Sequence, residues 1–259
     1  MTSAAGAMRR NLDLVLYKTY ADLKAEAART YVNYLWWIFD PLISLGIYYI
    51  VFAVLFQRGG EGFVFVLLVG LVIWRWYAEA VGHGAGTILG GRGLMAQVHV
   101  PKWIFPIVCL LTDSTKFAVV FVLLLAVLFM SGHGLGTPLL AVPLLLVIQF
   151  VFIASVSTLV ASLVPFLPDL RVVVTNVLQL QMFLSGVFFR ADTIPERYHD
   201  LFFLNPMARL INEYRVVLID GQWPDFEALA YLGLFSLALL FAALSLVRRF
   251  DRHYPRIVV

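Results

Sequence analysis

Long apolar runs separated by short polar breaks dominate the chain. Residues 117–168 contain no Asp, Glu, Lys or Arg. A run of that length exceeds one membrane helix of about 20 residues and suits two. The break at residues 131–138 is rich in glycine and ends in Pro138, which is the composition of a turn. We therefore predict two antiparallel membrane helices joined by a hairpin turn.

The same pattern along the whole chain predicts an all-α membrane protein with six transmembrane helices. The apolar segments that define them are residues 35–56, 63–81, 103–130, 139–164, 172–189 and 228–247. We expect one membrane domain over residues 1–259. Within it, residues 1–33 form a cytoplasmic N-terminus, residues 35–247 form the six-helix part, and residues 248–259 form a cytoplasmic tail. The composition agrees, because 61% of the residues are hydrophobic and only 14% are charged.

The N-terminal stretch has the pattern of an amphipathic helix. Its apolar positions recur at helical spacing, at Leu12, Val15, Leu16, Thr19, Tyr20, Leu23 and Ala27. We expect this helix to lie along the cytoplasmic membrane surface. It could equally serve only to fix the topology.

The segment at residues 191–221 precedes the last predicted span, and its apolar pieces are too short and too charged to cross a bilayer. Residues 198–204 and 207–219 each have the pattern of a short amphipathic helix. Asn205-Pro206 separates them, because proline removes a donor and disfavours helix for the residue before it. A re-entrant hairpin that enters the outer side and returns fits best. The alternative is a hairpin that lies in the outer leaflet and has no gating role.

The distribution of Lys and Arg predicts the orientation. Twelve of these residues fall in the connections on one side of the predicted spans and five on the other. Because basic residues concentrate in cytoplasmic connections, both termini should be cytoplasmic. The first 30 residues mix acidic and basic side chains without a continuous apolar core, so we do not expect a secretory signal.

Charged residues inside the predicted spans form two pairs at helical spacing. Arg75 and Glu79 are four residues apart, and Asp113 and Lys116 are three apart. An unpaired charge at membrane depth is costly, so we interpret both as structural intramembrane ion pairs. Two local pairs are too few for a proton relay across the membrane.

Motifs of catalysis and metal binding are missing from the sequence. None of the four lysines follows a glycine, so there is no phosphate-binding loop, and neither His-Glu-x-x-His nor Gly-x-Ser-x-Gly occurs. Cys109 is the only cysteine, so we expect a packing residue and no metal site. Gly82, Gly86 and Gly90 recur every four residues, which favours close helix packing. We therefore expect neither an enzyme nor a nucleic-acid binder, and no cofactor in this chain.

Three segments carry a resemblance to a known family. They are Tyr34-Leu35-Trp36-Trp37-Ile38-Phe39-Asp40-Pro41-Leu42 after the amphipathic helix, residues 93–106 between the second and third spans, and Leu204-Asn205-Pro206-Met207 with Arg215 and Gly221. Together they resemble the type-2 ATP-binding-cassette permeases that export O-antigen and capsular polysaccharides. The resemblance covers nearly the whole chain. Teichoic acid exporters and some drug exporters carry related patterns.

The resemblance implies a permease of the bacterial inner membrane that forms a homodimer. Two copies of a separate ATPase subunit would carry ATP and Mg²⁺, the substrate would be a lipid-linked glycan, and periplasmic export components are candidate further partners. The connection between the second and third spans would contact the ATPase through Gln97, Val98, His99, Val100, Pro101 and Lys102. The outer hairpin would gate the exit, with Asn205, Pro206 and Arg215 as its candidate residues.

A polysaccharide path favours aromatic side chains, because sugars slide over aromatic faces that need few committed hydrogen bonds. The candidate conduit residues are Trp36, Trp37, Tyr48, Tyr49, Phe52, Phe56, Phe183, Phe188 and Phe189. Packing in the bundle or at the membrane interface would explain any one of them.

Three other functions remain open from the sequence. They are a drug or small-lipid/teichoic-acid exporter of the same architecture, a membrane enzyme acting on lipid-linked sugars, and a scaffold that transports nothing. The enzyme ranks low because no acidic or metal-binding groups converge in the sequence. The identities of the glycan and of its lipid carrier are not readable from the residues.

Overall fold

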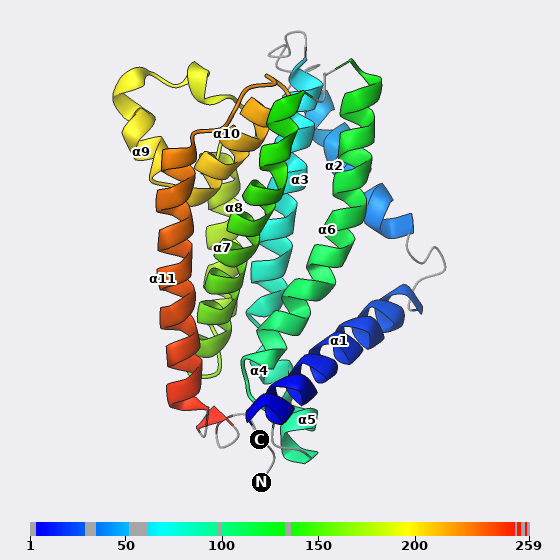
Figure 1. Cartoon of the computed structure of the whole chain (residues 1–259), viewed down its shortest axis with the longest axis vertical. Coiled ribbons are helices and arrows are strands. Elements are labelled where there is room, and N and C mark those ends of the chain that lie inside the picture. Colours follow the sequence, from blue (N-terminus) through cyan, green and yellow to red (C-terminus); the bar gives the residue numbers. More distant parts are fainter. Residues whose placement is uncertain are drawn as a thin grey trace.

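The computed structural model describes residues 4–28, 35–51, 62–97, 100–132, 136–251, 253–254 and 257. Every regular element in these residues is a helix. The helices form an upright bundle, and the N-terminal helix α1 (Ala4–Ala28) lies obliquely against one side of it (Figure 1). The predicted all-α fold is therefore confirmed in the described residues.

Four helices in the described residues are long and apolar enough to cross a membrane. They are α3 (Phe63–Gly84), α6 (Ile104–Met130), α7 (Val142–Leu163) with the preceding 3₁₀ turn η3 (Thr137–Ala141), and α11 (Phe226–Phe250). Each matches one predicted span to within a few residues. Four of the six predicted spans are therefore confirmed as candidate membrane helices.

The other two predicted spans correspond to shorter helices. α2 (Trp36–Tyr49) ends two residues before residues 52–61, which lie outside the described part of the chain. α8 (Leu170–Leu184) is apolar but has only 15 residues. Six spans thus remain a prediction. The chain direction nevertheless alternates along the bundle through α2, α3, α6, α7, α8 and α11 (Figure 1).

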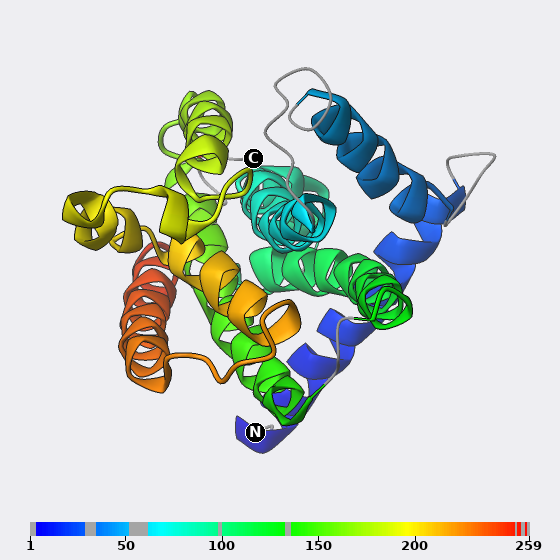
Figure 2. The same ribbon diagram turned by 90° about the horizontal axis from the view of Figure 1, so that it is seen from above.

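α3 lies near the middle of the bundle when it is seen from above, with the other long helices around it (Figure 2). Two pairs of stacked rings hold it there. Trp76 stacks on Phe117 of α6, with ring centroids 4.1 Å apart and planes 9° from parallel. Tyr77 stacks on Phe152 of α7 at 5.6 Å. Such pairs contribute about 0.5–1.5 kcal/mol each beyond the apolar area that they bury.

Gly84 allows α3 and α7 to approach each other closely. A Cβ at this position would clash with the Ser157 hydroxyl oxygen. The predicted packing glycines are less constrained: Gly82 and Gly86 have only side-chain atoms nearby, at 3.3 Å or more, and Gly90 has no atom within 4 Å. A four-residue repeat identifies a helix face, whereas the tightest contact depends on which neighbour lies against that face.

α1 packs against α6 through one edge of its predicted apolar face. Val15 and Thr19 are buried, whereas Leu12, Leu16 and Tyr20 are exposed. One edge of the apolar face therefore contacts the bundle, and the exposed residues can contact lipid.

The segment before α11 forms the two short helices that the sequence predicts. They are α9 (His199–Phe203) and α10 (Pro206–Leu218). Asn205 caps α10, since its Oδ1 accepts a hydrogen bond from the Met207 backbone N–H at 3.1 Å. Both helices lie at the opposite end of the bundle from α4 (Thr87–Gly90) and α5 (Arg92–Gln97) (Figure 1). Whether the pair enters a membrane remains a prediction.

Candidate functional site

A cavity of about 540 Å³ lies among α2, α3, α6 and α8. Two predicted conduit aromatics and all four residues of the predicted ion pairs line it: Trp36, Tyr48, Arg75, Glu79, Asp113 and Lys116. The fold thus brings together two sets of residues that the sequence placed in separate roles. The cavity combines aromatic faces with paired charges.

The paired charges also connect helices. Arg75 Nε donates to Glu79 Oε1 at 2.5 Å, within α3. Lys116 Nζ donates to Asp113 Oδ1 at 3.2 Å, within α6, and to Glu26 Oε1 of α1 at 2.7 Å. Lys116 therefore links the end of α1 to α6. The spacing of residues within one helix does not reveal this contact.

The other conduit candidates divide between the cavity wall and the end of α8. The Tyr48 ring lies 4.8 Å from that of Phe188, which in turn lies 5.3 Å from that of Phe183. Phe189 instead contacts Phe202 of α9, at 5.9 Å between ring centroids. The described part of the chain includes neither the side chains of Trp37 and Tyr49 nor any atom of Phe52 and Phe56.

The predicted coupling residues run from the last residue of α5 towards the start of α6, and only part of this stretch is described. Gln97 is exposed and Pro101 is half-buried, whereas Val98 and His99 lie outside the described residues. Val100 is buried against α1 and α6. Lys102 is also buried, at 2% exposed.

Lys102 binds the end of α11. Its Nζ lies 3.6 Å from Asp251 Oδ2, and its backbone N–H donates to Asp251 Oδ1 at 3.2 Å. Lys102 therefore holds the connection onto the bundle instead of presenting a free charge to a partner.

The chain beyond α11 is packed into the bundle at Tyr254. This side chain is fully buried, and its hydroxyl donates to the Ser162 carbonyl of α7 at 3.1 Å. Burial raises the pKa of Tyr254 to about 12, so the phenol is neutral at physiological pH. The predicted tail thus includes an anchored part.

Arg215 of the predicted outer gate is 4% exposed and binds only backbone carbonyls in the described residues. Its Nε and Nη2 donate to Val66 O at 3.2 and 2.8 Å. Nη1 donates to Gly186 O at 2.7 Å and to Phe189 O at 2.8 Å, and Nη2 donates to Val187 O at 2.8 Å. These contacts hold α10 against α3 and against the turn after α8.

Two further residues shape this contact. Gly70 makes room for the guanidinium, because a Cβ there would lie 2.6 Å from Arg215 Nη2. Asn205 Nδ2 donates to Ser185 Oγ at 2.8 Å, and Asn205 Oδ1 accepts from Gln181 Nε2 at 3.1 Å. Since Pro206 begins α10 directly afterwards, the predicted gate residues join this helix to the end of α8.

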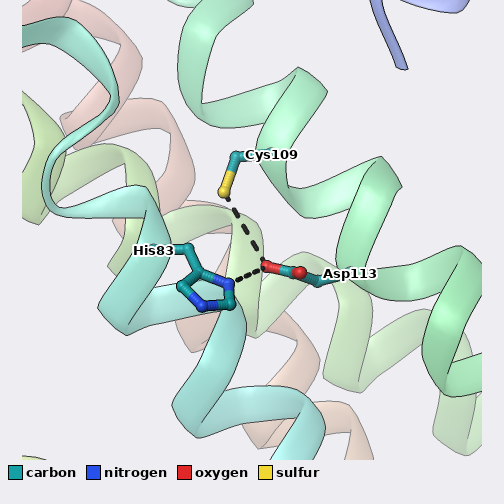
Figure 3. Close-up of side chains that lie close together, drawn as sticks. All are labelled: His83, Cys109 and Asp113. Carbon is teal, nitrogen blue, oxygen red and sulfur yellow. Dashed lines mark hydrogen bonds and ion pairs between the residues drawn. The ribbon is translucent and has the colours of Figure 1, made fainter. Parts of the chain in front are cut away.

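One cluster of chemically capable side chains was not predicted. His83 Nδ1 of α3 lies 3.0 Å from Asp113 Oδ2 of α6, and Cys109 Sγ lies 3.8 Å from the same oxygen (Figure 3). The sequence offers a partial signal, since Cys109 and Asp113 are four residues apart on one helix face. Only the packing of α3 against α6 adds His83.

Comparison with known proteins identifies the family of this chain. The profile of the family described as ABC-2 type transporter matches residues 19–219. The O-antigen export system permease protein RfbA of Myxococcus xanthus is 27% identical over 235 residues, which cover 90% of both chains. A protein of the same name from Klebsiella pneumoniae is 23% identical over 250 residues, 95% of both chains. The polysialic acid transport protein KpsM of Escherichia coli is 23% identical over 230 residues, 88% of this chain and 89% of KpsM.

The family match extends from α1 to the end of α10 and includes the cavity, the inner connection and the Arg215 contact. ABC-2 permeases are membrane components of transporters that work with a separate ATP-binding subunit. Apolar helices of membrane-spanning length agree with this assignment. The chain belongs to the ABC-2 type transporter family.

Proposed function

We propose that this chain is the membrane permease of an ATP-driven exporter that moves lipid-linked polysaccharide, of the O-antigen or capsule type, across the bacterial inner membrane. The observation that carries the proposal is the extent of the similarity. Relatives named for O-antigen export and polysialic acid transport align over about nine tenths of both chains. A drug or small-lipid/teichoic-acid exporter is the alternative, and the names of these relatives favour polysaccharide.

The proposed assembly is a homodimer with two copies of a separate ATPase subunit, which binds ATP and Mg²⁺. Periplasmic export components are candidate further partners. In the single chain, α8 has no buried residue and exposes Val173, Val177 and Leu180. Apolar side chains on α2, such as Leu42 and Ile47, are exposed as well. A second copy or lipid would cover both faces.

The proposed topology has six spans with both termini in the cytoplasm. The alternating direction of the six helices supports it, as does the position of the inner connection, which shares one end of the bundle with the last turns of α11 (Figure 1). ATPase coupling is assigned to Gln97, Val98, His99, Val100 and Pro101. Lys102 would fix the base of this connection through Asp251.

The glycan path is assigned to the aromatic side of the cavity and to the end of α8. Trp36, Tyr48 and Phe183 offer ring faces there, and Trp36 and Phe183 remain 43% and 49% exposed in the single chain. At the outer end, α9 and α10 would form the gate. Asn205 and Pro206 set the bend between them, and Arg215 holds α10 in place.

The test compares export with the amount of inserted protein. Tyr48→Ala should reduce surface polysaccharide far more than it reduces permease in the membrane, because a lost ring face weakens the passage of every repeat unit. Tyr48→Phe should be mild. Tyr231→Ala provides the control, since this exposed tyrosine of α11 lies outside the cavity lining.

Equal loss of export and of membrane protein in Tyr48→Ala would contradict a role in the path. Normal polysaccharide with loss of drug resistance in a strain lacking the permease would favour the alternative exporter. In the same preparations, purified permease without its partner should hydrolyse no ATP, because the sequence has no phosphate-binding loop.

A further inference from the structure

We propose that His83, Cys109 and Asp113 form a binding site for a borderline divalent cation such as Zn²⁺ between α3 and α6. The three side chains offer one nitrogen, one sulfur and one oxygen within 4.8 Å of one another. They come from two helices and meet beside the cavity (Figure 3). This site is independent of the proposed transport of polysaccharide.

The distances fit one ion. With Zn–N, Zn–O and Zn–S bonds of about 2.0, 2.1 and 2.3 Å, tetrahedral geometry places nitrogen and oxygen roughly 3.4 Å apart and sulfur and oxygen roughly 3.6 Å apart. The observed separations are 3.0 Å from His83 Nδ1 to Asp113 Oδ2 and 3.8 Å from Cys109 Sγ to the same oxygen. The His83 nitrogen and the Cys109 sulfur lie within 4.8 Å of each other, against roughly 3.5 Å in a tetrahedral site, so both side chains would have to rotate towards the ion.

The ligand types select the class of metal. A thiolate, an imidazole and one carboxylate suit Zn²⁺ and its neighbours in the first transition row, whereas Mg²⁺ and Ca²⁺ prefer oxygen alone. Binding converts the Cys109 thiol to a thiolate and releases its proton to solvent. The imidazole binds in its neutral form, through Nδ1.

Lys116 supplies the supporting contact that metal-binding carboxylates require. It donates to Asp113 Oδ1 at 3.2 Å, so it holds the carboxylate by one oxygen and leaves Oδ2 directed at His83 and Cys109. Partners of this kind orient a ligand and raise metal affinity by about 10–100-fold.

The site is accessible from two sides. His83 and Asp113 line the 540 Å³ cavity and also a second cavity of about 750 Å³ beneath α1, which Cys109 lines as well. The side chain of His83 is 57% exposed, whereas that of Asp113 is 3% exposed. A metal ion can therefore enter with a water molecule as its fourth ligand, and once bound it would fasten α3 to α6.

The sole cysteine makes the test specific. We would titrate purified, tag-free permease with Co²⁺ as a spectroscopic probe, because Co²⁺ bound to a thiolate gives a near-ultraviolet charge-transfer band that only Cys109 can produce in this chain. We expect a band that saturates at one Co²⁺ per chain and disappears when Zn²⁺ is added. Cys109→Ser should abolish it, and His83→Gln should weaken Co²⁺ binding about tenfold or more.

His199→Gln is the matched control and should leave the band unchanged, because His199 is the first residue of α9, at the far end of the bundle. A second measurement needs no substitution: Zn²⁺, but not Mg²⁺, should slow maleimide labelling of Cys109 in the unmodified chain. Absence of a cysteine-dependent band would overturn the site. So would Zn²⁺ protection of Cys109 that is equally strong in His83→Gln.

Discussion

Replacing Arg215 by methionine should destabilise the folded permease strongly. The substitution keeps a long apolar stem and removes the five hydrogen bonds that the guanidinium donates to backbone carbonyls. Gly186, Val187 and Phe189 would each lose such a bond in the turn after α8. A buried acceptor left without a partner costs about 1–3 kcal/mol, so the three carbonyls together cost about 3–9 kcal/mol.

Local repacking and entry of water will recover part of that cost, so we expect a loss of about 3–6 kcal/mol in the free energy of unfolding. For a chain of this size, each kcal/mol lowers the melting temperature by about 2–4 °C. The Arg215→Met variant in detergent should therefore melt about 6 °C or more below the unmodified protein. The melting temperature of Arg215→Lys should lie between those of Arg215→Met and the unmodified protein, because an ammonium has three donors and lacks the planar fork of a guanidinium.

The assay is thermal unfolding followed by tryptophan fluorescence, with export measured in parallel. Arg190→Met is the control: Arg190 Nη2 donates to Asp220 Oδ2 at 2.6 Å, but its side chain is 34% exposed. A surface pair of this kind contributes about 0–1 kcal/mol. If Arg215→Met unfolds at the temperature of the unmodified protein and yet loses export, the residue acts in gating and the structural reasoning fails.

Two further predictions concern helix packing. Gly84→Ala should lower accumulation in the membrane, because its Cβ would clash with the Ser157 hydroxyl and lie 3.1 Å from Ser157 Cβ, and adding Ser157→Gly should restore part of it. Gly90→Ala should accumulate normally, and equal behaviour of the two alanine variants on membrane immunoblots would contradict the assignment. Tyr254→Phe should cost about 1 kcal/mol through its lost bond to Ser162, and Tyr254→Ala about 3–5 kcal/mol through the lost ring, as measured by thermal unfolding. Unchanged stability of Tyr254→Ala would show that the chain beyond α11 does not depend on this anchor.

The sequence predicts those parts of the fold that depend on local properties. α3, α6, α7 and α11 follow from the length of their apolar runs, since a membrane helix must be about 20 residues long. The boundary between α9 and α10 follows from Pro206, because proline acts on the residue directly before it. Both properties are contained in a few consecutive residues.

Contacts between distant helices are not predictable in this way. Lys102 belongs to a polar connection and is of a residue type that is usually exposed, yet it is buried and pairs with Asp251 near the other end of the chain. His83 gives no sign in the sequence of its position beside Cys109 and Asp113. In each case the sequence supplies the chemical group, whereas tertiary packing supplies its neighbour.

The fit between Gly70 and Arg215 also limits how this sequence can diverge. A side chain at position 70 would occupy space that is already filled, because a Cβ there would lie 2.6 Å from the Arg215 guanidinium and 2.7 Å from the Val187 carbonyl. Any larger residue at 70 therefore has to displace both the arginine and the backbone at Val187. Among homologues that share this arrangement, glycine should be retained at position 70 even where the arginine is replaced.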